Sequence, residues 1–151
     1  MKHYFWTVVM MAIACVFTAC GSKESGNKQL VLYYSQTGAT KAVAETIQKM
    51  LDADVEAIEL ENPYTGSYAE TVQRAGQERQ SGNMPKLKPL TSDLSKYETI
   101  YLGFPIWYGT YALPIASLVK EYDFEGKKIV TFCTFGSGGL EPAMADLKNA
   151  L

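Results

Sequence analysis

Residues 35–40 carry the first group of side chains that could do chemistry, in the order Ser35, Gln36, Thr37, Gly38, Ala39 and Thr40. Three hydroxyls here surround a glycine at the predicted start of a helix, where free backbone N–H groups and the positive end of the helix dipole face outward. Such a loop can wrap one phosphate group. It lacks the lysine of a Walker loop and the spaced glycines of a dinucleotide fold, so a terminal monophosphate fits best. The alternative is a hydroxyl-rich helix cap.

Two further segments combine aromatic rings with glycine. One consists of Pro105, Ile106, Trp107, Tyr108 and Gly109, and the other of Thr134, Phe135, Gly136, Ser137 and Gly138. An exposed cluster of aromatic rings suits a large planar ligand that stacks on them. A monophosphate at one end and a flat ring at the other describe flavin mononucleotide (FMN).

The elements that must position these segments alternate between strand and helix. The patterns predict strands at 30–34, 55–60, 99–104 and 129–135, and helices at 40–51, 68–80, 113–122 and 140–151. The first strand is apolar throughout, which is typical of burial on both faces. Val43, Ile47 and Met50 or Leu51 are the expected buried stripe of the first helix, and the second helix is expected to be mostly solvated. This order indicates an α/β fold with a parallel sheet covered by helices on both faces. Ligands bind at the carboxyl ends of such strands, where all three segments fall.

Together the motifs Ser35-x-Thr37-Gly38-x-Thr40, 103–109 and 134–138 resemble the flavodoxins, and the likeness runs from about residue 30 to residue 151. The resemblance implies a flavodoxin-like doubly wound sheet with FMN as cofactor. It places the phosphate on Ser35, Thr37, Gly38 and Thr40, the flavin ring against Trp107 and Tyr108, and the pyrimidine side of the ring on the third segment.

The chain departs from the resembled family at its end. A complete flavodoxin has strand order 2-1-3-4-5 and a fifth helix. The resemblance therefore implies the order 2-1-3-4 here, with the fifth strand and last helix missing. Residues 129–135 would then form an uncovered edge strand without charge or proline, which invites association with another chain. We expect either a fragment of a longer protein or self-association through this edge.

Residues 1–19 are predicted to be a signal peptide. Lys2 precedes an uncharged run over 4–19, and small residues then stand before Cys20. This pattern resembles a bacterial lipoprotein processing site, which implies a lipid on Cys20, a polar tether over 20–28 and a domain over 29–151. The expected location is the bacterial cell envelope, anchored by lipid on its periplasmic or surface face. Simple secretion and an uncleaved anchor are the alternatives.

Composition excludes several classes of function. The net charge of −2 and the scattered lysines and arginines argue against nucleic acid. His3 is the only histidine and falls in the signal, so the processed chain has no Ser-His-Asp relay and no histidine zinc site. Cys133 is the only cysteine of the domain, and we interpret it as an inert buried thiol. No catalytic residue and no metal site are predicted.

The leading hypothesis is an FMN-binding redox protein that transfers electrons at the cell envelope, with unidentified proteins or small molecules as donor and acceptor. One alternative is an FMN-dependent reductase of quinones or small molecules. Another is a non-redox binding lipoprotein with a vestigial flavin site. Glu59 or Glu61 could be the ribose-binding acid of a dinucleotide fold, but the first segment is wrong for it, and both are expected to face solvent.

Overall fold

The computed structural model describes residues 28–151. The predicted signal peptide, the predicted lipidation site at Cys20 and nearly all of the predicted tether lie outside the described residues. Within residues 28–151, no helix combines the length and the apolar character that crossing a bilayer requires.

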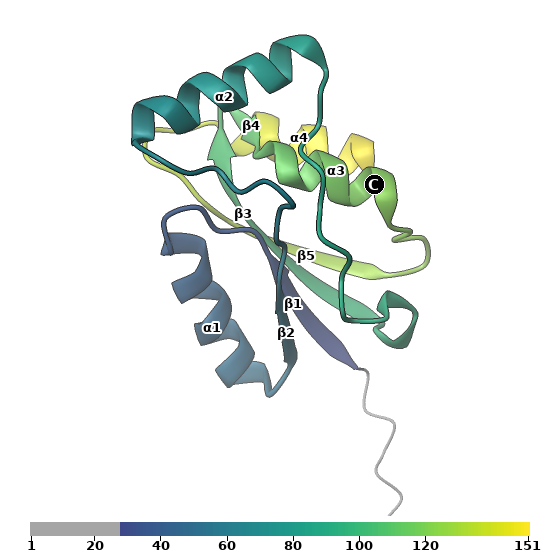
Figure 1. Ribbon diagram of the computed structural model, residues 1–151. Coiled ribbons are helices and arrows are strands. Elements are labelled where there is room, and N and C mark those ends of the chain that lie inside the picture. The colour runs from purple at the N-terminus through teal and green to yellow at the C-terminus, as the bar shows by residue number, and fades with distance from the viewer. Residues whose placement is uncertain (1–27) are drawn as a thin grey trace, which may run out of the picture.

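Strands and helices alternate along the described chain, as Figure 1 shows. The elements are β1 (Gln29–Tyr33), α1 (Ala39–Leu51), β2 (Asp54–Ala57), α2 (Tyr68–Ser81), the 3-10 helix η1 (Leu94–Lys96), β3 (Thr99–Trp107), β4 (Thr110–Tyr111), α3 (Leu113–Glu121), β5 (Lys128–Thr134) and α4 (Leu140–Ala150).

The sheet is parallel in the order β2-β1-β3-β5, and the short β4 pairs antiparallel with the end of β3. Helix α1 covers one face, α3 and α4 lie on the other, and α2 crosses above the end of β3 (Figure 1). The predicted doubly wound sheet and its strand order are therefore confirmed, with β5 in the place of the predicted fourth strand.

Two strands end more than one residue away from the predicted position. The second strand ends at Ala57, and Leu60 forms only an isolated bridge with Leu87. The third strand runs on to Trp107 and turns back into β4, a hairpin that the sequence analysis missed. The two residues of its turn, Tyr108 and Gly109, have φ angles of 53° and 77°, as a tight hairpin turn between twisted strands requires.

Strand β1 is buried on both faces, as its apolar run predicts. Leu30 and Leu32 belong to the larger core under α3 and α4, whereas Val31 and Tyr33 pack on the α1 side. Successive residues lie on opposite faces of the sheet because neighbouring side chains of a strand point in opposite directions.

The predicted buried stripe of α1 is largely wrong. Thr40 and Ala44 are its buried residues, while Val43 is 39% and Met50 78% exposed. The small side chains of Thr40 and Ala44 are the ones covered on this helix, and the larger apolar residues Val43, Met50 and Leu51 stay exposed. Ile47 packs against the core as expected.

Strand β5 is an edge, since among residues 28–151 it pairs only with β3. After the exposed Lys128, all its residues are half-buried. The ring of Phe132 lies over Gly103, where an added Cβ would come within 2.2 Å of it, so no larger residue fits at that position. Cys133 is half-buried, and burial raises the pKa of its thiol, which keeps it in the less reactive neutral form.

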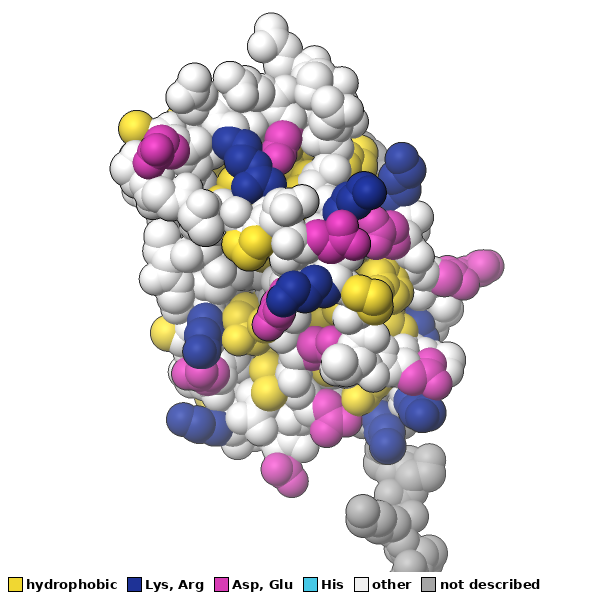
Figure 2. Space-filling model, viewed as in Figure 1, with side chains coloured by type: hydrophobic (Ala, Val, Ile, Leu, Met, Phe, Trp, Pro, Cys, Tyr) yellow, Lys and Arg dark blue, Asp and Glu magenta, His cyan; other side chains and the backbone are white. Residues whose placement is uncertain are grey.

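Charged side chains of both signs lie close together on the face shown in Figure 2. Residues 28–151 contain three exposed ion pairs, Lys41 with Glu45, Lys88 with Glu59 and Lys96 with Asp93. Exposed pairs of this kind contribute little to stability. Glu59 and Glu61 are both exposed, as expected.

Candidate functional site

The first turn of α1 presents free backbone donors. Gly38 is its N-cap, with a φ of 93°, and the Oγ of Ser35 accepts the N–H groups of Gly38 at 3.1 Å and Lys41 at 3.2 Å. Within residues 28–151, the N–H groups of Ala39 and Thr40 have no hydrogen-bond acceptor. The first turn also contains no acidic residue to offset the positive end of the helix dipole. This is the arrangement that binds an anion.

A hydroxyl pair connects this loop to the segment after β5. Thr40 is buried, with 1% of its surface exposed, and its Oγ1 lies 2.8 Å from the Oγ1 of Thr134. The first and third predicted segments, far apart in the sequence, therefore meet at the carboxyl edge of the sheet.

A cavity of about 440 Å³ opens beside these residues, within the size range of small-molecule sites. Its walls come from the loop after β1, the end of β3 with its turn, the loop after β5, and α2. Most of the predicted site residues line it, namely Gln36, Thr37, Thr40, Pro105, Ile106, Trp107, Tyr108, Gly109, Thr134, Gly136, Ser137 and Gly138.

Four predicted residues do not line this cavity. The Ser35 side chain is engaged by the backbone of the helix start. Gly38 and Ala39 belong to the N-terminus of α1, where only their backbone groups could contact a ligand. Phe135 is absent from the lining and is 49% exposed.

Trp107 is the last residue of β3, although the sequence predicted it in a loop. Its ring meets Tyr34 and Tyr64 edge-on, with centroid distances of 5.8 Å and 5.4 Å. Both tyrosines are buried. Both rings pack against the indole, which also lines the cavity.

Tyr108 connects the hairpin turn to α2. Its side chain is 56% exposed, and its hydroxyl donates to the carbonyl oxygen of Val72 at 2.6 Å. Gly76 of α2 makes room for this contact, because a Cβ at that position would lie 2.9 Å from the tyrosine oxygen.

Sequence reasoning missed the contribution of α2. Four of its residues line the cavity, in the order Tyr68, Thr71, Val72 and Ala75. The helix is indeed mostly exposed, but its two buried residues face the site. The available signal was the row of small side chains at Thr71, Ala75 and Gly76, which repeats at helical spacing in an otherwise polar segment.

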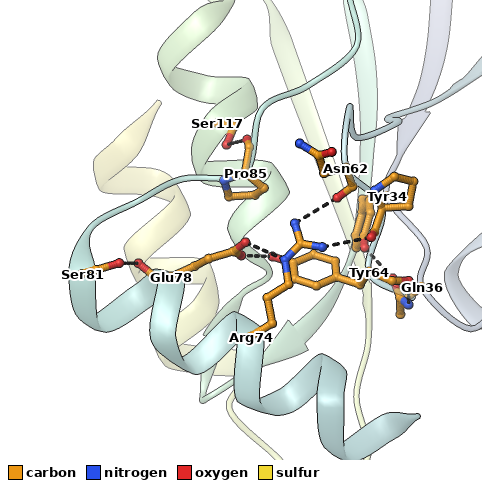
Figure 3. Close-up of polar contacts among 10 residues, drawn as sticks. Tyr34, Gln36, Asn62, Tyr64, Arg74, Glu78, Ser81, Pro85 and Ser117 are labelled. Carbon is orange, nitrogen blue, oxygen red and sulfur yellow. Dashed lines mark hydrogen bonds and ion pairs between the residues drawn. The ribbon is translucent and has the colours of Figure 1, made fainter. Parts of the chain in front are cut away.

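A polar cluster attaches α2 to the loop that precedes it, as Figure 3 shows. The Arg74 guanidinium pairs with Glu78 at 2.8 Å and donates to the carbonyls of Asn62 and Pro63, each at 2.9 Å. It also lies 4.3 Å from the centre of the Tyr64 ring, and the Tyr64 hydroxyl donates to Glu78. A single side chain thus joins α2 to the loop that precedes it.

Gln36 extends this cluster to the first segment. Its amide oxygen accepts from the Tyr34 hydroxyl at 2.7 Å, and its amide nitrogen donates to the Tyr64 carbonyl at 3.0 Å. Burial raises the pKa of both tyrosines, and the hydrogen bond to Glu78 raises that of Tyr64 further. The two hydroxyls therefore stay protonated and serve as donors. Among residues 28–151, no group of His, Cys, Asp or Glu side chains is placed to hold a metal ion.

Comparisons with known proteins agree with this architecture. A candidate flavoprotein from Bacteroides uniformis is 31% identical, with a TM-score of 0.74 and 82% of each chain covered. A second from Bacteroides eggerthii is 26% identical, with a TM-score of 0.75, 82% of this chain and 80% of that chain covered. A flavoprotein from Lactobacillus acidophilus in complex with FMN is 24% identical and shares the fold, with a TM-score of 0.75, 83% of this chain and 86% of that chain covered. None of the curated proteins matches.

A family model described as Flavodoxin matches residues 28–151, which is the whole of the described chain. The resemblance carried by the three sequence segments is thereby confirmed at the level of the family. This chain belongs to the flavodoxin family.

Proposed function

We propose that this chain binds FMN in the cavity at the carboxyl edge of its sheet and acts as a redox protein. The observation that carries the proposal is the continuity of the site: Thr37 and Thr40, at the start of α1 with its free N–H groups, and the aromatic wall at Trp107 border one space. A phosphate group and a planar ring on one ligand need this combination. Family membership and the FMN complex of the Lactobacillus acidophilus protein support it.

Each segment would hold a different part of the cofactor. The N–H groups of Ala39 and Thr40, with the Ser35 and Thr37 hydroxyls, would hold the phosphate. Trp107 and Tyr108 would pack against the ring, and the segment 134–138 would take its pyrimidine side. Bound FMN supplies one- or two-electron chemistry, and the protein sets its potential through stacking, hydrogen bonds and local charge.

Electron transfer is the favoured activity within this proposal. Residues 28–151 contain no histidine, and burial keeps Tyr34 and Tyr64 protonated. A reductase of quinones or other small molecules, the second candidate, would have to draw its protons from a tyrosine, a carboxylate or water. We further propose that a lipid on Cys20 places the domain at the cell envelope, near its electron donor and acceptor.

Titration of the purified protein with FMN and with riboflavin tests the cofactor assignment. Flavin absorption and fluorescence should show much tighter binding of FMN, because only FMN carries the phosphate. Thr37→Ala should weaken FMN binding roughly tenfold to a hundredfold, since it removes one hydrogen bond to a charged group, about 1.5–3 kcal/mol. Riboflavin binding should not change.

Thr46→Ala is the matched control, because Thr46 lies on the exposed surface of α1 and bonds only within its own helix. It should leave the affinities for both flavins unchanged. Equal affinity of the wild type for FMN and riboflavin would refute the phosphate loop. A protein that stays colourless after incubation with FMN would refute the cofactor and favour the binding protein with a vestigial site.

A further inference from the structure

Helix α2 contributes the least expected wall of the cavity. Thr71 and Ala75 are its buried residues, with 9% and 2% of their surfaces exposed, and both line the cavity. Most of the remaining helix faces solvent. The small side chains of α2 thus lie where the helix approaches the site.

This wall is held mainly by polar contacts at fixed points. Arg74 and Glu78 attach it to the loop before the helix, and Tyr108 attaches it to the hairpin turn. Arg79 adds a contact to the carbonyl of Tyr111 at 3.4 Å. The anchors are spread along α2, so the helix cannot pivot freely away from the site.

Tyr64 fixes α2 relative to Trp107. Its ring supports the indole edge-on at 5.4 Å, its face is covered by the Arg74 guanidinium, and its hydroxyl donates to Glu78. If α2 moved away from Trp107, Tyr64 would lose either its contact with the indole or its contacts with Arg74 and Glu78. The distance between the aromatic wall and the helical wall is set by this shared support.

We infer that Ala75 and Thr71 are specificity-determining residues, which set the width of the ring site between α2 and the end of β3. The inference rests on the proposed FMN function. The small side chains leave space for a flat fused ring, and because Tyr64 holds both walls in place, the site cannot widen to accept a larger residue. The phosphate loop lies on α1, so its binding groups should be independent of this width.

Ala75→Leu tests the inference, with Ala69→Leu as the matched control. Ala69 is exposed on the same helix, and alanine and leucine both have high helix propensity, so the two changes differ mainly in where the added atoms point. Ala75→Leu should lower FMN affinity at least tenfold, whereas Ala69→Leu should leave it unchanged. Inorganic phosphate should still shift the amide NMR signals of Ala39 and Thr40 in both variants.

Circular dichroism establishes that each variant is folded. If Ala75→Leu fails to fold, Thr71→Leu is the second variant, because Thr71 lines the same wall and is slightly more exposed than Ala75. It should show the same loss of FMN affinity and should still bind phosphate. Failure of the wild type to bind FMN would overturn the proposed function and this inference together. The role of α2 alone would be overturned if the wild type binds FMN and the folded Ala75→Leu or Thr71→Leu variant binds it with the same affinity.

Discussion

Gly76 is the residue at which the geometry of the site can be tested by stability alone. Glycine in a helix interior costs about 0.8–1.0 kcal/mol relative to alanine, so Gly76→Ala should stabilise an isolated helix by that amount. In this protein the new Cβ would lie 2.9 Å from the Tyr108 hydroxyl oxygen. The exposed tyrosine can swing aside, but it then loses its hydrogen bond to Val72, which contributes about 0.5–1.5 kcal/mol. The two effects nearly cancel.

The Tyr108→Phe background separates these two effects. Without the hydroxyl, the nearest ring atom lies 3.5 Å from the new Cβ, an ordinary van der Waals contact. Gly76→Ala should then give its full gain of about 0.8–1.0 kcal/mol. The double-mutant cycle should therefore show a coupling energy of about 0.5–1.5 kcal/mol between the two positions.

Urea unfolding of the four proteins, followed by circular dichroism, measures this coupling. Gln77→Gly, on the exposed face of α2, is the control and should lower the free energy of unfolding equally in both backgrounds. If Gly76→Ala stabilises the wild type and Tyr108→Phe by the same amount, Tyr108 is not held against α2 and the described contact between the hairpin turn and this helix is wrong.

Four further predictions concern other parts of the molecule. Trp107→Ala should weaken FMN binding by about 0.5–1.5 kcal/mol and reduce quenching of flavin fluorescence. Undiminished quenching would exclude the contact of Trp107 with the ring and make Tyr108 the next residue to test. Partial burial alone would raise the pKa of Glu56, but hydrogen bonds from residues 91–92 hold it below its usual value, so Glu56→Gln should destabilise the protein at neutral pH. Because a lowered folded-state pKa gives stability that is lost as pH falls through it, urea unfolding should show this deficit shrinking in acid; a constant deficit would contradict the charge effect. Cys20→Ser should release the protein from membranes in cell fractionation, and unchanged membrane association would exclude the lipid anchor. Sedimentation at rising concentration should show self-association through β5. A stable monomer that binds FMN would show that the sheet is sufficient with β5 as an open edge, and that the edge argument is wrong.

Local patterns in the sequence predicted the architecture because each depends on neighbouring residues. The apolar run at 30–34 requires a strand buried on both faces, and the alternation of strand and helix patterns leads to a parallel sheet. The turn-forming residues at 35–40 and 134–138 then fall at one edge of that sheet, since all parallel strands end on the same side. The meeting of these segments follows from these constraints, whereas the order β2-β1-β3-β5 was expected from the flavodoxin resemblance.

Residues with ambiguous local patterns were placed less well. Val43 and Met50 fit a helical stripe, yet the structure buries Thr40 and Ala44, because the closeness of α1 to the sheet decides which side of the helix is covered. Trp107 was predicted in a loop, after a strand that was expected to end at residue 104. Pairing with the short β4 extends the strand through that position, and this pairing becomes visible only when the hairpin forms.

The sequence by itself determined the order of the elements, the hydroxyl loop at the start of α1 and the family likeness, because these reside in spacing and composition. The tertiary structure alone decided which side chains share the cavity. Thr40 meets Thr134 across 94 positions, and Tyr108 reaches Val72 across 36. No periodicity encodes such contacts, since they depend on how α2, a mostly polar helix, is anchored over the end of β3. The helical wall of the site exists because Arg74, Glu78 and Tyr64 fix that position.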